Sequence, residues 1–343
     1  MVEKIRSIIT PEEFDYLRIL HQDGENVSIE HVRDRMAISR SSADKYRNCL
    51  AENGLLNSKG NGIQSDYSCY LGISVKSNCI NYTVVGLNGQ VVPWLDENGT
   101  IKFINNSIEG FVETCEEIKV YIDEKFKSKN LQGICFSFDD VDKEKDIFYL
   151  SNIEGHFKFA DFIRLIFSEY KHIHFSLISN VMSLLYAQEF PFKKSKNDRV
   201  CIMQTQSGVY AAEISNNKVK YGFNKQTHNI SDLLDGKQLE RLATNKITGQ
   251  EEIEIYESIV KYFMIISNAE RISILKSKEI KEKEYDKFVF YLNNNKSCIR
   301  NYLPDITLVP ESRISYGAAI SAMYYSFGWN ETMIWLRINQ SIF

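Results

Sequence analysis

The chain has 343 residues, of which 43% are hydrophobic and 25% are charged, and its formal net charge is −4. This length predicts two or three domains with their own cores, and the small net charge excludes a protein that binds nucleic acid over its whole surface. The seven cysteines are scattered, without a CxxC pair or a Cys/His cluster, so we expect no disulfide framework, no metal site and no cofactor. No leader and no apolar run of about 18 residues is present, which predicts a cytoplasmic protein without a membrane partner.

The first 60 residues contain start and stop signals for three helices. Thr10 is an N-cap candidate, Pro11 stands at the first helical position and Glu13 follows the cap by three residues, which predicts a helix over about 11–22. Ser28 and Ser39 are placed to cap a second and a third helix. Two helices joined by a tight turn within 28–50 are typical of a helix-turn-helix, which places its second helix in the DNA major groove.

A short hairpin is predicted directly after the third helix. Gly54 ends that helix, Leu55 and Leu56 begin a strand, and the segment 57–62 has the composition of a turn. Residues 1–66 are therefore expected to form a winged helix DNA-binding domain. A three-helix bundle without a nucleic-acid role is the alternative.

The register of the third helix selects the candidate DNA contacts. Ala43, Tyr46 and Leu50 share one face and should pack inward. The opposite face, the helix start and the wing tip supply the predicted DNA-binding residues, which are Ser39, Arg40, Ser41, Ser42, Lys45, Arg47, Asn48, Lys59 and Asn61. We expect Arg40 and Lys45 to reach base edges, and Asp44 to pair with Arg40 or Arg47.

The charge of this region is compatible with a few phosphate contacts. Residues 33–60 contain six basic residues (Arg33, Arg35, Arg40, Lys45, Arg47, Lys59) against three acidic ones (Asp34, Asp44, Glu52), a local excess of three positive charges. A solvated helix of mixed charge would have a similar composition.

The rest of the chain contains strand and helix patterns in two successive groups, and the second group begins with strands as the first does. A hairpin signal at Asn88-Gly89 is followed by a helix over 108–127, a strand over 133–138 and a strand-to-helix passage over 173–188. Strand patterns return at 199–204, 209–214 and 217–223, before helices at 253–268 and 279–292. This order resembles the actin-like, ribonuclease H-like sugar kinase fold. The resemblance implies an α/β body of two lobes, residues 67–188 (completed by a C-terminal helix, about 314–343) and residues 189–313, the second with a role in dimerisation.

With a winged helix in front of such a body, the chain resembles the ROK family, whose members are repressors, open reading frames and sugar kinases. The resemblance is carried by the helix-turn-helix, by Leu71-Gly72-Ile73 with the hairpin after it, by the segment 151–155 and by the small residues of 316–322. It implies a transcriptional regulator with a sugar kinase-like body.

The positions that would carry kinase chemistry in this family are altered. Ser74 takes the place of the acid in the first strand, and Lys76 and Ser77 take the places of its glycines. Of the glycines expected in the second phosphate loop only Gly208 is present. Asn180 stands at the position of the catalytic aspartate, and an amide cannot accept the proton of a sugar hydroxyl. We therefore expect the protein not to be an enzyme.

The resemblance also implies a ligand site between the lobes, for which the candidates are Asn152, Ser179, Asn180, Asn229 and Asp232. The resulting prediction is a homodimeric regulator, most simply a repressor, that reads a palindromic double-stranded DNA operator and has a small-molecule carbohydrate as a possible effector. Two alternatives stay open: a divergent carbohydrate kinase, and a ligand-independent dimeric regulator that responds to a protein partner.

Overall fold

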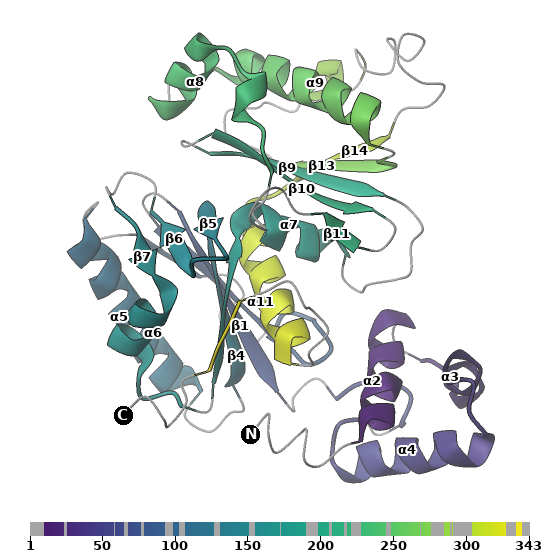
Figure 1. Ribbon diagram of the computed structural model, residues 1–343. Coiled ribbons are helices and arrows are strands. Elements are labelled where there is room, and N and C mark those ends of the chain that lie inside the picture. The colour runs from purple at the N-terminus through teal and green to yellow at the C-terminus, as the bar shows by residue number, and fades with distance from the viewer. Residues whose placement is uncertain are drawn as a thin grey trace.

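The computed structural model describes residues 10–23, 26–57, 59–64, 68–76, 79–92, 99–102, 107–126, 131–150, 155–171, 173–189, 198–205, 208–215, 218–220, 228–244, 248–267, 269–275, 285–288, 290, 304–326 and 334–337. In these residues a small N-terminal helical unit is followed by two α/β lobes (Figure 1). No helix in this part of the chain is long and apolar enough to cross a membrane.

The N-terminal unit (residues 10–64) contains α2 (Pro11–Asp23), α3 (Ile29–Met36) and α4 (Arg40–Glu52). Its helices start where the capping residues predict. The Thr10 hydroxyl accepts from the backbone N–H of Glu13, whose carboxylate accepts in return from the N–H of Thr10. Ser28 caps α3 by accepting from the N–H of His31. The turn between α3 and α4 contains Ala37 in the left-handed conformation, with φ of 54°.

The predicted hairpin is present after α4. Leu56 and Ile63 form an antiparallel bridge, and the N–H of Asn57 donates to the carbonyl of Gly62 at 2.8 Å. Three helices followed by this hairpin are the arrangement of a winged helix.

The two lobes contain sheets with the same strand order. The first sheet has the order β15-β8-β4-β1-β2-β3, in which β1 pairs antiparallel with β2 and parallel with β4. Its strands are β1 (Cys69–Val75), β2 (Cys79–Gly86), β3 (Gly99–Lys102), β4 (Leu131–Phe138), β8 (His174–Ser179) and β15 (Ile334–Arg337). Written in the opposite direction, the second sheet has the corresponding order β11-β10-β9-β13-β14, without a counterpart of β15 among the described residues. It again has an antiparallel pair (β9, β10) beside a parallel pair (β9, β13). Its strands are β9 (Arg199–Thr205), β10 (Gly208–Ser215), β11 (Lys218–Lys220), β13 (Arg271–Leu275) and β14 (Asp305–Val309), with β12 (His228–Asn229) paired to β10. The prediction of two lobes built on one plan is confirmed.

Helices cover both sheets in layers. In the first lobe, α5 (Ile108–Lys125) and α6 (Phe159–Phe167) pack on one face through aromatic side chains such as Phe111 and Phe162. In the second lobe, α8 (Gly236–Ala243) and α9 (Gly249–Ile266) lie on the side away from the first lobe (Figure 1). Between the two sheets lie α7 (Asn180–Glu189) and α11 (Ser312–Ser326), whose apolar residues share one core cluster with residues of both sheets.

The helices α7 and α11 pack with their backbones in close approach. A Cβ added to Gly317 of α11 would overlap the carbonyl of Ser183 on α7, and one added to Gly72 of β1 would overlap the carbonyl of Ser315. Small residues at these positions therefore let α11 lie against both its neighbours.

Several elements differ from the sequence predictions. The C-terminal helix ends at Ser326, and β15 adds an edge strand to the first sheet. After the hairpin turn at Gly89, Val91 makes only an isolated bridge, and the third paired strand is β3. A three-stranded sheet of β5 (Asp140–Asp142), β6 (Ile147–Tyr149) and β7 (Phe157–Lys158) was not predicted. Most of the helix expected over 279–292 lies outside the described residues.

The N-terminal unit packs directly against the first lobe. Leu17 and Leu20 of α2 belong to the same core cluster as Leu87 of the hairpin and Met323 of α11. In this contact His21 is buried, with Nε2 3.3 Å from the sulfur of Met323 and its ring 5.7 Å from that of Tyr324. Burial lowers the pKa of His21 to about 4, so its imidazole is neutral at pH 7.

Candidate nucleic-acid interface and candidate effector positions

The N-terminus of α4 presents three serine hydroxyls close together. Ser39 is the N-cap, and its hydroxyl accepts from the N–H of Ser42 at 3.1 Å. The hydroxyls of Ser41 and Ser42 each lie 2.9 Å from that of Ser39. A helix N-terminus with short polar side chains lets a phosphate come close to the free backbone N–H groups, which the helix dipole also favours.

One face of α4 is exposed and polar along its length. Ser41, Lys45 and Asn48 are exposed, whereas Ala43 and Leu50 on the opposite face are fully buried. This is the orientation that the sequence predicts. Within the described part of the chain, Lys45 has no carboxylate within ion-pair distance, so its ammonium group is available to another partner.

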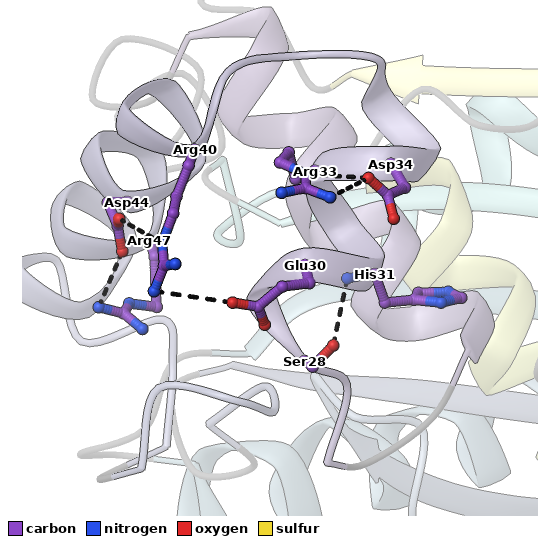
Figure 2. A network of polar contacts seen from close by, with 8 residues as sticks. All are labelled: Ser28, Glu30, His31, Arg33, Asp34, Arg40, Asp44 and Arg47. Carbon is purple, nitrogen blue, oxygen red and sulfur yellow. Dashed lines mark hydrogen bonds and ion pairs between the residues drawn. The ribbon is translucent and has the colours of Figure 1, made fainter.

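The arginines of α4 are paired with carboxylates (Figure 2). The guanidinium of Arg40 lies 3.7 Å from Glu30 and 4.0 Å from Asp44, and that of Arg47 lies 3.2 Å from Asp44. The sequence predicted that Asp44 pairs with Arg40 or Arg47, and in the structure it lies within ion-pair distance of both. Both arginines remain partly exposed, at 70% and 36% of their side-chain surface.

The hairpin places Lys59 and Asn61 differently from each other. Lys59 is exposed, and its backbone N–H donates to the side chain of Asn57 at the turn. The amide of Asn61 instead donates to the side chain of Asn26 at 3.1 Å, and its Oδ1 is buried. Asn61 therefore joins the hairpin to the loop before α3, and its expected contact with DNA is not supported by this geometry.

Asn180 at the start of α7 is the centre of a buried polar network. Its Nδ2 donates to the carbonyl of Val75 at 3.1 Å and to the carboxylate of Asp139 at 2.8 Å. Its Oδ1 accepts from the hydroxyls of Ser74 and Ser137. An amide can donate two hydrogen bonds and accept two, so Asn180 has no capacity left for an effector, and the expectation of a ligand contact here is corrected.

Ser179 also has a structural role. It is 2% exposed, and its hydroxyl accepts from the N–H of Met182 in the first turn of α7. Such a cap satisfies one of the free donors at the helix start, so a direct contact of Ser179 with an effector is not supported either.

The start of β10 is covered by a side chain where a phosphate loop was expected. Gly208 has φ of +144°, and a Cβ added to it would overlap the hydroxyl of Ser231. That hydroxyl accepts from the backbone N–H of Val209 at 3.0 Å. The backbone N–H of Val209 is therefore already bonded within the chain, whereas residues 206 and 207 of the expected loop lie outside the described residues.

Of the other effector candidates, Asn229 and Asp232 are exposed on the second lobe. The Oδ1 of Asn229 accepts from the N–H and the hydroxyl of Ser231, at 3.0 and 2.6 Å. In the described residues, neither the Nδ2 of Asn229 nor the carboxylate of Asp232 has a protein partner. Asn152 lies outside the described residues.

Three residues of these networks were not singled out from the sequence. Asp139 and Ser137 lie at the end of β4 and reach Asn180, and Ser231 covers Gly208. The polar residues Ser137 and Asp139 at the end of a buried, mostly apolar strand are a signal that could have indicated the first two. No such signal marks Ser231 in the sequence, because its bonding partner Val209 is 22 residues away.

Comparison with known proteins identifies the fold. No protein-family model matches the chain, and no curated protein matches it significantly in sequence. Its structure is similar to that of a ROK family transcriptional regulator, a homologue of the E. coli MLC protein, with 13% identity and a TM-score of 0.64 over 94% of this chain and 98% of that chain.

Two further solved structures match the body. One is a ROK family protein from Streptococcus pneumoniae TIGR4 in complex with sucrose, with 13% identity and a TM-score of 0.51 over 76% of this chain and 100% of that chain. The other is a ROK family glucokinase from Streptomyces griseus in complex with glucose and AMPPNP, with 10% identity and a TM-score of 0.50 over 74% of this chain and 99% of that chain. The chain therefore has the actin-like α/β fold of ROK family proteins, preceded by a winged helix.

Proposed function

We propose that the protein is a DNA-binding transcriptional regulator, most simply a repressor, that reads a palindromic operator as a homodimer. The observation that carries this proposal is the exposed polar face of α4, where Ser41, Lys45 and Asn48 lie beside a hairpin with the exposed Lys59. A recognition helix of this kind reads base edges in the major groove while the hairpin contacts phosphate. The match to a ROK regulator covers more of this chain than the match to a ROK glucokinase, which agrees with this function.

The interior of the body supports a role other than phosphoryl transfer. At the position of the general base, Asn180 is fully buried and its amide is fully hydrogen-bonded. At the second phosphate loop, the hydroxyl of Ser231 is bonded to the N–H of Val209. A kinase would need a proton acceptor at the first place and backbone N–H groups that face the phosphates at the second, and the N–H of Val209 is not free for this.

The effector part of the proposal rests on the second lobe. Asn229 and Asp232 offer an amide and a carboxylate that can hydrogen-bond sugar hydroxyls, and one of the similar structures contains sucrose. A carbohydrate that binds one arrangement of the lobes better than the other would change the spacing of the two recognition helices in a dimer.

The decisive experiment is the selection of bound duplexes from a random DNA pool with the full-length protein. A palindromic consensus supports a dimeric operator reader, because two-fold symmetry of the protein imposes the same symmetry on the site. If no sequence is enriched at any salt concentration, the proposal is wrong. ATP consumption in the presence of a panel of hexoses tests the kinase alternative, and turnover with any of them would favour it.

The first prediction distinguishes base contacts from phosphate contacts on the selected operator. Lys45→Ala should weaken operator binding by about 1–3 kcal/mol while leaving binding to random duplex nearly unchanged. Lys59→Ala should weaken binding to both DNAs and lower the slope of log K against log salt by about one. Unchanged operator affinity of the Lys45→Ala protein would show that this face of α4 does not meet the bases.

The effector is tested by calorimetry with sugars and sugar phosphates. Heat of binding that is lost in Asp232→Ala, while operator binding persists, would support a site on the second lobe. A regulator without any such heat would instead be ligand-independent, which is the remaining alternative.

A further inference from the structure

Each of the four arginines of α3 and α4 is paired with a carboxylate of the N-terminal unit itself. On α3, Arg33 lies 2.6 Å from Asp34 and Arg35 lies 3.1 Å from Asp23. On α4, Arg40 and Arg47 share Asp44. A surface that binds DNA through phosphate contacts alone would gain most from unpaired cations, so this pairing calls for a physical explanation.

Asp44 is the carboxylate that lies near both arginines of α4 (Figure 2). It follows Arg40 by four residues and precedes Arg47 by three, so all three side chains lie along one flank of α4. The stem of Arg47 also lies against the hairpin, because a Cβ on Gly60 would be 3.5 Å from its Cδ. From the other side, Glu30 at the start of α3 reaches Arg40 at 3.7 Å. Asp44 thus lies within ion-pair distance of two guanidinium groups, that of Arg47 at 3.2 Å and that of Arg40 at 4.0 Å, on the flank of the helix beside its exposed polar face.

The consequences of these pairs differ between random DNA and an operator. Exposed ion pairs of this kind contribute only about 0–1 kcal/mol each, so a phosphate can displace them. On random DNA, where phosphate contacts supply nearly all of the affinity, Arg40 and Arg47 must leave Asp44, and the carboxylate then faces the phosphates with a like charge. On an operator, base contacts from the exposed face with Lys45 supply affinity that does not depend on breaking the pairs. Arg40, which lies near Glu30 and Asp44, is not counted among these base contacts, in contrast to the sequence prediction. Guanidinium groups that are already paired lose less freedom on binding.

We propose that Asp44 is a specificity-determining residue, which holds Arg40 and Arg47 in ion pairs and thereby weakens binding to non-operator DNA more than binding to the operator. This inference rests on the proposed DNA-reading function and concerns the same surface. Asp44 is an acidic residue within residues 33–60, which carry a local excess of positive charge, and the proposal gives this acidic residue a role in DNA recognition.

The test compares Asp44→Asn with the native full-length protein on the selected operator and on a random duplex, at several salt concentrations. Asp44→Asn should bind random duplex three- to tenfold more tightly and with a salt slope steeper by about one, while its operator affinity stays within about twofold. The ratio of the two affinities should therefore fall by at least threefold. Glu30→Gln, which releases Arg40 without changing α4, should lower the ratio in the same direction by a smaller factor.

Asp34→Asn is the matched control. It removes the same charge from the same unit, and Asp34 is 67% exposed and pairs only with Arg33 on α3 among the contacts described. Its affinity ratio should stay at the native value. An equal fall of the ratio in Asp34→Asn, or equal gains on both DNAs in Asp44→Asn, would overturn the inference and leave only an effect of net charge. If the native protein selects no operator at all, the proposed function itself fails, whatever Asp44 does.

Discussion

At the scale of single residues, Ala37 is the most informative position of the N-terminal unit. It forms the turn between α3 and α4 with φ of 54° and ψ of 42°, a conformation that costs a residue with a Cβ roughly 1–2 kcal/mol. Ala37→Gly should therefore raise the stability of this unit by about 0.5–1 kcal/mol, since glycine adopts the turn without strain but loses more entropy on folding. Ala37→Val should lower it, because a β-branched side chain is poorly tolerated there.

These effects are measurable by hydrogen exchange of the α3 and α4 backbone amides in the full-length protein. Slower exchange in Ala37→Gly and faster exchange in Ala37→Val is the expected order. If glycine accelerated exchange, the left-handed turn would not be a source of strain.

Residue-scale prediction from sequence succeeded where partners are close along the chain. Ser28 and Ser39 cap their helices as expected because each partner N–H is three residues away. The polar residues at the strand ends can be noticed in the sequence, but their contacts with Asn180 could not be predicted, since Ser137 is 43 residues and Ser74 is 106 residues distant from it. The sequence shows an amide at position 180 but not that this amide is fully hydrogen-bonded.

At the scale of elements, the packing of α11 on α7 depends on Gly317. Gly317→Ala would normally stabilise a helix by up to about 1 kcal/mol. Here the added methyl would overlap the carbonyl of Ser183, so the two helices must separate and we expect a net destabilisation of roughly 1–3 kcal/mol. Gly236→Ala is the control, because no atom lies within 4 Å of the Cβ it would add at the start of α8. Urea unfolding should show a lower midpoint for Gly317→Ala alone, and equal midpoints for the two variants would contradict this close packing.

Helices and turns with a strong local sequence pattern were predicted well. Strands that form only by pairing with a distant part of the chain were not. The helix over 108–127 corresponds to α5, and the hairpin signal Asn88-Gly89 gave the correct turn. The strand β15 was missed because Ile334–Arg337 becomes a strand by pairing with the edge strand β8, more than 150 residues earlier in the chain. The strand patterns that open each half, 71–92 and 199–223, were sufficient to predict two lobes. The strands β13 and β14 of the second lobe were not predicted, because β13 becomes a strand by pairing with β9, which lies 72 residues earlier in the chain, and β14 by pairing with β13.

At the scale of the whole molecule, His21 connects the winged helix to the body. The neutral imidazole is buried against Met323 and Tyr324 at the end of α11. The other end of α11 begins beside the second lobe, where Glu311 pairs with Lys76 of the first lobe. In a detached N-terminal unit the pKa of His21 would return towards its ordinary value of 6.5, whereas in the docked unit it is about 4. The detached state therefore binds more protons between these two values, and acidification from pH 6.5 to pH 4 should shift the equilibrium towards detachment, with no effect above pH 6.5.

The measurement of this effect must report docking rather than global stability. Burial raises the pKa of Asp146 in the first lobe to about 6, so this lobe gains stability from Asp146 as the pH falls through the same range, opposite in sign to the effect of His21. Small-angle scattering separates the two, because detachment increases the radius of gyration while both lobes stay folded. The native protein should expand between pH 6.5 and pH 4.5, and His21→Gln, which carries no charge at any of these values, should not. Equal expansion of both proteins would show that another group controls the contact, and that α11 does not hold the winged helix through this neutral histidine.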